Sequence, residues 1–150
     1  MLLCKLLWYI EATNWEDKGD INIFTFEKLE KTINQFEKQH HGNKASILQI
    51  HLSSGTYLEV GLGYPKIWLF YVSPNECKTS LGDKENRDIV EFWWGNESEE
   101  FRKRELIPNA LARHAILYFV KSGGKLTEEV TWYDGLLESD IDEIPEDIPF

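Results

Sequence analysis

The side chains in this 150-residue chain that are best suited to acid–base chemistry near neutral pH are four histidines, His40, His41, His51 and His114. A catalytic histidine has to lie beside a nucleophile or a reacting group, and no local spacing places one next to any of the four. His40 and His41 lie at the C-terminal end of an expected helix, where the helix dipole favours positive charge. His114 lies beside the apolar side of a second expected helix. The histidines therefore indicate structural roles more than catalysis.

Other motifs for chemistry or metal binding lack the required spacing. The glycines of VGLGYP at 60–65 lie in a hairpin pattern, with no following helix whose N-terminus could hold phosphate. The pair Glu99-Glu100 lies on an expected strand, where neighbouring side chains point to opposite faces and cannot converge on one substrate bond. Cys4 and Cys77 match no zinc or CxxC spacing, and the acidic C-terminus lacks the register of an EF-hand loop. We therefore expect no enzymatic activity, no cofactor and no metal.

The elements that would position any functional surface follow from the apolar pattern. Alternating apolar residues predict strands over 3–10, 45–52, 56–63, 66–72, 88–95, 101–106 and 128–133. The strand at 66–72 is apolar on both faces, which predicts a central position with both faces covered. Residues 14–22 and 73–87 are polar and are expected to be loops.

Two segments have helical spacing. The first is 25–40, with Thr25 as the expected N-cap. The second starts at Pro108, ends at Gly123-Gly124, and has an expected apolar stripe of Leu111, Ala115, Tyr118 and Phe119. Together with the strands, these helices predict an α+β fold, in which a largely antiparallel sheet of about six or seven strands carries two main helices.

The net charge of the chain is −10, and most of it lies near the C-terminal end. From Asp134 onward there are seven acidic residues and no lysine or arginine, whereas the first 133 residues have a net charge of −3. Nucleic acids and anionic membranes attract basic proteins, so the charge argues against direct binding to either. It favours a basic protein partner. We expect a single domain over residues 1–133, followed by an acidic tail over 134–150.

The sequence predicts a cytoplasmic protein. Lys5 and Glu11 interrupt the apolar N-terminal run, and no basic segment precedes it, which is unlike a signal peptide. No run approaches the ~20 apolar residues of a membrane-spanning helix. Two cysteines that are far apart in sequence fit free thiols in a reducing compartment.

Three groups of residues are candidates for contact with a protein partner. Trp93 shares a strand face with Glu91, which predicts partial exposure, and tryptophan is frequent among binding hot spots; the alternative is that a loop or helix covers it. Trp15 and Glu16, in the first expected loop, have the same two interpretations. The tail alternates acidic with apolar residues and is either a solvated segment or an acidic arm that docks in a basic groove. Its acidic candidates are Asp134, Glu138, Asp140, Asp142 and Glu143.

The stretch from 107 to 132 resembles the C-terminal signature of a known family. The residues that carry the resemblance are Ile107-Pro108, Ala110, Ala115, Phe119, Gly123-Gly124, Val130 and Trp132. Upstream, TYLEVGLG followed by IWLFYV resembles the paired central strands of the same family. That family is the immunity-protein family designated "Imm, type one" from bacterial polymorphic toxin systems, and the similarity covers about 45–132.

The resemblance implies a non-enzymatic immunity protein that binds a cognate toxin domain and occludes its active site. The implied toxin is a basic, nucleic-acid-acting protein, typically a deaminase or a nuclease. The signature marks the fold, so it assigns no binding residue. Two other hypotheses stay open: a small ligand-binding or enzymatic α+β domain, with a pocket between sheet and helices near Tyr57, Tyr71 or His114, and an acidic adaptor subunit that docks a basic partner.

Overall fold

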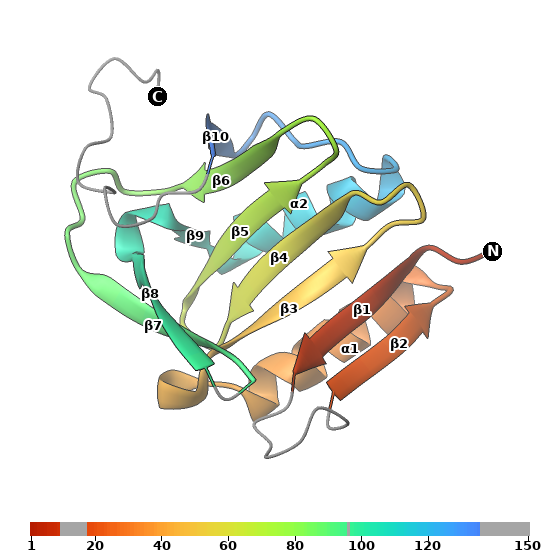
Figure 1. Cartoon of the computed structure of the whole chain (residues 1–150), viewed down its shortest axis with the longest axis horizontal. Coiled ribbons are helices and arrows are strands. Elements are labelled where there is room, and N and C mark those ends of the chain that lie inside the picture. The colour runs from red at the N-terminus through yellow and green to blue at the C-terminus, as the bar shows by residue number, and fades with distance from the viewer. Residues whose placement is uncertain (10–17, 96, 136–150) are drawn as a thin grey trace.

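The computed structural model of the chain describes residues 1–9, 18–95 and 97–135. These residues form ten strands and two α-helices. Figure 1 shows how these elements are arranged. The strands are β1 (Cys4–Tyr9), β2 (Lys18–Ile23), β3 (Ser46–His51), β4 (Tyr57–Leu62), β5 (Lys66–Val72), β6 (Cys77–Leu81), β7 (Ile89–Trp94), β8 (Glu97–Arg102), β9 (Leu106–Pro108) and β10 (Thr131–Asp134). The helices are α1 (Phe26–Gln39) and α2 (Asn109–Lys121), with short 3₁₀ helices η1 (Gly42–Lys44) and η2 (Lys103–Glu105).

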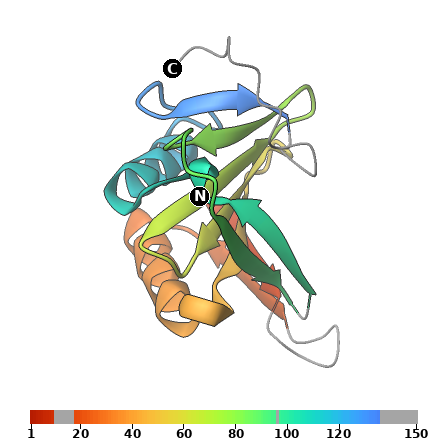
Figure 2. The ribbon, with the colours of Figure 1, turned by 90° about the vertical axis from the view of Figure 1, so that its left-hand side faces the viewer.

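The strands belong to one mostly antiparallel sheet. Its main path runs β10-β6-β5-β4-β3-β1-β2. The hairpin β7–β8 leaves this path and joins it through one parallel bridge between Ser46 and Trp93, while β9 pairs with the start of β5. Figure 2 shows the sheet in the middle, with both helices on one side and the β7–β8 hairpin on the other. The expected α+β class is confirmed, and the sheet has more strands than the expected six or seven.

Helix α1 forms where the apolar spacing predicts it. The hydroxyl of Thr25 accepts a hydrogen bond of 3.1 Å from the backbone N–H of Lys28, so the expected N-cap is confirmed. Leu29, Ile33 and Phe36 lie on one side of the helix and are each at most 3% exposed. Their burial against the sheet contributes roughly 1.5–3 kcal/mol each.

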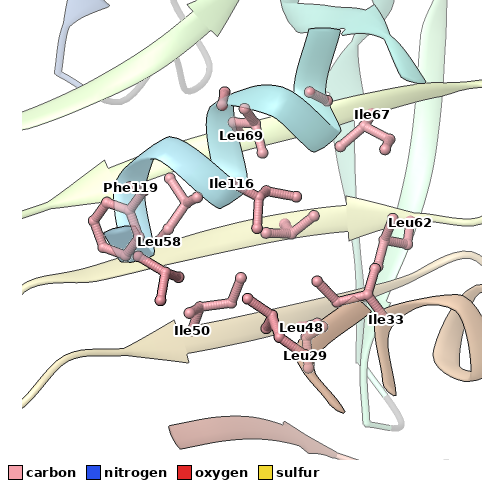
Figure 3. Close-up of a cluster of buried hydrophobic side chains, with 14 of the residues drawn as sticks. Leu29, Ile33, Leu48, Ile50, Leu58, Leu62, Ile67, Leu69, Ile116 and Phe119 are labelled. Atoms are coloured by element: carbon pink, nitrogen blue, oxygen red, sulfur yellow. The ribbon is translucent and has the colours of Figure 1, made fainter. Parts of the chain in front are cut away.

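Helix α2 is placed as expected, and its buried side agrees with the expected stripe except at one residue. Ala115 and Phe119 are buried, together with Ile116, whereas Tyr118 is 39% exposed. Leu111 is half-buried against the core, and the buried side also includes Ala112 and Val120. Figure 3 shows Ile116 and Phe119 lying over Leu58 and Leu69 of the central strands, with Leu29 and Ile33 of α1 beside Leu48.

A second apolar cluster lies on the opposite face of the sheet. Phe92 and Phe101 of the hairpin pack against Trp68 of β5, at ring-centroid distances of 6.4 and 4.6 Å. Gly61 makes this packing possible, because a Cβ there would lie 2.7 Å from the ring of Phe92. Strand β5 is therefore covered on both faces, as the sequence predicts.

Two expected loops contain strands. Residues 14–22 include most of β2, which pairs with β1 along its whole length, and 73–87 include β6, which pairs with β5 and β10. Strands β2 and β6 are short and rich in polar residues, so the alternation of apolar and polar residues along them is weak. The expected strand at 101–106 is also wrong: β8 ends at Arg102, and a 3₁₀ turn separates it from β9.

Candidate partner-binding surface

The hairpin covers only part of the sheet face that lies opposite the helices. It packs on Ile47, Trp68 and Phe70. The neighbouring part of this face, called here the open face, is formed by β1, β3 and β4 and is turned toward the viewer in Figure 1. Strand alternation and cross-strand pairing place six half-buried residues on it: Lys5, Leu7, Gln49, His51, Tyr57 and Glu59.

A chain of side-chain hydrogen bonds orders the open face. The amide nitrogen of Gln49 donates to Oε2 of Glu59 at 2.6 Å, and the Gln49 oxygen lies 2.7 Å from Nε2 of His51. The donation to Glu59 identifies the other atom of the Gln49 amide as its oxygen, which can only accept. His51 Nε2 therefore carries the hydrogen and donates it to the Gln49 oxygen. The His51 ring stacks on Tyr57 with 4.7 Å between ring centroids. These contacts hold four polar side chains in fixed positions across β3 and β4.

The electrostatics of the open face follow from partial burial. Burial raises the pKa of Glu59; the hydrogen bond from Gln49 opposes this, and the nearby carboxylate of Glu99 on β8 adds to it. Burial lowers the pKa of His51, and the positive charge of Lys5 lowers it further. Burial also raises the pKa of Tyr57. The site therefore favours neutral histidine beside one half-buried and one exposed glutamate.

The positive charge on this face already has a partner. Lys5 Nζ lies 3.6 Å from a carboxylate oxygen of Asp20 on β2, and both side chains are over two-fifths exposed. Such an exposed pair contributes little to stability, but it neutralises the lysine locally. Among the described residues, neither Glu59 nor Glu99 forms an ion pair. Two carboxylates without an ion-pair partner among the described residues therefore lie near each other at this face.

Two of the candidates from the sequence, Glu91 and Trp93, lie together on the outer side of the hairpin. Trp93 is half-buried, as the alternation predicts. Glu91 is exposed; its carboxylate accepts a 3.1 Å hydrogen bond from Ser98, and its backbone carbonyl accepts one of 2.8 Å from the Tyr64 hydroxyl. The two residues point away from the buried side chain of Phe92, which lies between them in sequence.

The third described candidate, Asp134, lies apart from that pair. It ends β10 at the far edge of the sheet, where its carboxylate lies 3.1 Å from Lys78 Nζ. The remaining candidates, Trp15, Glu16, Glu138, Asp140, Asp142 and Glu143, lie outside the described residues. The structure therefore brings Glu91 and Trp93 together and separates both from Asp134.

The residues of the ligand-pocket hypothesis do not converge. Tyr57 belongs to the open face, Tyr71 is buried beneath α2, where its ring meets Phe119 edge-on, and His114 lies on the outer side of α2, where it pairs with Glu129. The space between sheet and helices is filled by the core in Figure 3. A shallow depression lies instead along the outer side of α1, between Glu27 and Lys38.

The other histidine and cysteine side chains that could take part in chemistry have structural roles. His40 and His41 each place Nδ1 near a backbone carbonyl of α1, at 2.9 and 3.1 Å. Cys4 and Cys77 are both free, and burial raises the pKa of the Cys4 thiol to about 11. Within residues 1–9, 18–95 and 97–135, no group of three or more histidine, cysteine, aspartate or glutamate side chains is placed to hold a metal ion.

A buried polar cluster is the main feature that the sequence does not reveal. Arg104 and Glu105 of η2 are each 1% exposed. Trp68 Nε1 donates to the Glu105 carboxylate at 2.9 Å, and the Ser80 hydroxyl donates to the Glu105 backbone carbonyl at 2.7 Å. Burial raises the pKa of Glu105 to about 7. In the sequence, FRKREL is an ordinary polar edge segment, so neither spacing nor composition signals that two of its charged residues are buried.

Comparison with known proteins gives one informative result. The family model described as "Immunity protein Imm1" matches residues 17–134. The match runs from the start of β2 to the end of β10 and so includes β2 and α1, which lie before the segment that carries the resemblance in the sequence. No curated protein matches the chain significantly. Among the described residues, no helix has the length and apolar character needed to cross a membrane.

Proposed function

This chain belongs to the Imm1 family of immunity proteins, and on that premise we propose that it is an antitoxin that binds a cognate toxin domain and covers its active site. The observation that carries the proposal is the family match over residues 17–134, which includes the helices and nine of the ten strands. The proposed toxin is a nucleic-acid deaminase or nuclease of a bacterial polymorphic toxin system. The proposed mode of action is stoichiometric binding in the cytoplasm, without catalysis.

The charge of the chain supports a nucleic-acid-acting target. Enzymes that grip nucleic acid use lysine and arginine to replace condensed counterions, so their clefts are basic. A protein with a net charge of −10 is attracted to such a cleft and competes with the nucleic acid. The accessible surface of the chain is 8864 Å², and a standard interface needs only about 800 Å² from each partner.

The contact residues named from the sequence remain proposals. Glu91 and Trp93 on the outer side of the hairpin are one candidate patch, and Asp134 at the end of β10 belongs to another. Replacing Trp93 by alanine tests the first, since a tryptophan in the centre of an interface typically carries more than about 2 kcal/mol of binding free energy.

Co-expression with the toxin encoded by the adjacent reading frame tests the proposed function. We expect cells that express both proteins to survive, and the purified proteins to form a stoichiometric complex in size-exclusion chromatography. His114→Ala should rescue cells as well as the unmodified chain does, because no catalytic histidine takes part. Cells with the toxin and an empty vector are the control.

Two results would contradict this proposal. One is the absence of a complex between the two purified proteins. The other is rescue that persists when the toxin is in large molar excess, since occlusion needs one inhibitor for each toxin molecule whereas an enzyme turns over.

A further inference from the structure

We propose that the open face of the sheet, with Glu99 of β8 at its border, is the surface that receives basic side chains of the toxin. This inference rests on the proposed function and names the part of the molecule that performs it. It differs from the contact sites expected from the sequence, which lie on the outer side of the hairpin, at the end of β10, and in segments outside the described residues.

The first observation is that this part of the sheet has no covering layer among the described residues. The other face is packed by α1 and α2, and the hairpin covers Ile47, Trp68 and Phe70. Next to these residues, the side chains of β1, β3 and β4 are half-buried and mostly polar. A partner that lies on this surface would meet hydrogen-bonding groups at the centre of the sheet, which suits a polar protein interface.

The second observation is that the open face is ordered before binding. The hydrogen bonds that join Glu59, Gln49 and His51 are 2.6 and 2.7 Å long, and His51 is also stacked on Tyr57. Side chains that are already fixed lose little conformational entropy when a partner arrives. Tyrosine is also one of the residues most frequent among binding hot spots.

The third observation is the charge. The carboxylate of Glu99 is close enough to Glu59 to raise the pKa of Glu59, and Lys5 is already paired with Asp20. A lysine or arginine of the partner placed between the two carboxylates would relieve their repulsion and gain charge-assisted hydrogen bonds. A toxin cleft that binds phosphates carries such basic side chains.

The helix side of the molecule does not offer the same complementarity. Along the outer side of α1, acidic and basic residues alternate, with Glu27 and Glu30 beside Lys31 and Lys38. Their charges largely cancel over the distance of one interface, so this surface has no single sign that would select a basic partner.

The test compares two charge reversals that change the net charge equally. Glu99→Lys reverses a charge at the open face, and Glu30→Lys reverses one on α1; both residues are exposed, so neither change should disturb folding. The probe is the catalytically inactivated product of the adjacent toxin reading frame, and its affinity is measured by isothermal titration calorimetry. Circular dichroism verifies the fold of each variant.

We expect Glu99→Lys to weaken binding at least about tenfold, with Glu30→Lys within about twofold of the unmodified chain. Since both changes alter long-range steering alike, the difference between them reports local contact. Glu59→Gln, which keeps the shape of the side chain, should weaken binding by about three- to tenfold and should reduce the salt dependence.

The outcomes separate the inference from the proposed function. If the unmodified chain binds the probe and Glu99→Lys and Glu59→Gln bind equally well, the open face is not the interface, while the antitoxin function stands. A larger loss for Glu30→Lys than for Glu99→Lys would also overturn the inference and would place the interface on the helix side. If the unmodified chain does not bind the probe at all, both the function and the inference are wrong.

Discussion

The folded chain should lose stability as the pH rises from about 4.5 to about 7, because the carboxyl group of Glu105 is buried in the fold. The side chain is 1% exposed, and Oε2 has no hydrogen-bond partner among the described residues. Burial raises its pKa from 4.5 to about 7, although the hydrogen bond from Trp68 and the positive charges of Arg104 and Arg102 oppose the change.

The sign of the effect follows from proton binding. The unfolded chain releases the Glu105 proton near pH 4.5, whereas the folded chain keeps it up to about pH 7. The contribution of Glu105 to stability is therefore complete below pH 4.5 and is lost as the pH rises through 7. The difference between these pKa values corresponds to about 3 kcal/mol of unfolding free energy. About 2 kcal/mol of this loss of unfolding free energy falls above about pH 5.5. That pH range lies above the sequence pI of 4.8.

Glu105→Gln isolates this contribution, because glutamine resembles the protonated carboxyl group and does not titrate. Urea unfolding at about pH 5.5 and about pH 8, followed by tryptophan fluorescence, gives the free energy of unfolding for both chains. We expect the variant to gain about 2 kcal/mol relative to the unmodified chain between these two pH values and to be the more stable protein at the higher one. Glu128→Gln, at an exposed position, is the matched control and should show no such gain.

A variant that is clearly less stable than the unmodified chain at the higher pH would refute this reasoning. That result would mean that the carboxylate is ionised in the fold and that the neighbouring arginines stabilise it by more than burial costs.

Three further changes test the packing. Gly61→Ala should destabilise the fold by about 1–3 kcal/mol in urea unfolding, because the added Cβ would meet the buried ring of Phe92; a change below about 0.5 kcal/mol would show that the ring can move aside. Phe119→Ala should cost about 3–5 kcal/mol and Tyr118→Ala less than about 0.5, since only the first side chain is buried, and equal losses in thermal melts would contradict the assignment of the buried side of α2. Thr25→Ala should cost about 1 kcal/mol through loss of the N-cap, and helix content measured by circular dichroism should fall with it.

The sequence predicts those parts of the fold in which a single local pattern decides the outcome. Helix α1 follows from its N-cap and from apolar residues three and four positions apart, and β5 follows from apolar residues on both faces. In α2 the ends were predicted correctly, and so was the buried side except for Tyr118, which is exposed. Leu, Ala, Ile, Tyr, Phe and Val all occur within this helix, so apolar spacing alone allows more than one stripe. Which side is buried depends on the tilt of the helix across the sheet.

The missed elements depend on partners that are distant in sequence. Strand β2 has the sequence KGDINI, in which only Ile21 and Ile23 face the core, and it becomes a strand because β1 offers a free edge. Strand β6 is stabilised by β5 on one side and β10 on the other. The buried position of Glu105 likewise depends on hydrogen bonds from Trp68 and Ser80, which lie 37 and 25 residues away in the sequence. Local pattern carries no information about such contacts.

The open face escaped prediction for a related reason. Gln49, His51, Tyr57 and Glu59 alternate with buried leucine, isoleucine and valine, and this pattern normally indicates a strand with one face in water. Only the pairing of β1, β3 and β4 shows that these side chains form one surface, and only the position of the hairpin shows where it is left uncovered.

The buried residues of the C-terminal signature lie on the side of the sheet away from the open face. Ile107, Ala115, Phe119 and Val130 all belong to the core between sheet and helices, and Trp132 packs against it. Open-face side chains lie outside this core, so we expect substitutions there to disturb its packing little. An immunity fold needs this separation if it is to meet different toxins while keeping one core. The same separation explains why the signature in the sequence identifies the fold but does not indicate the binding partner.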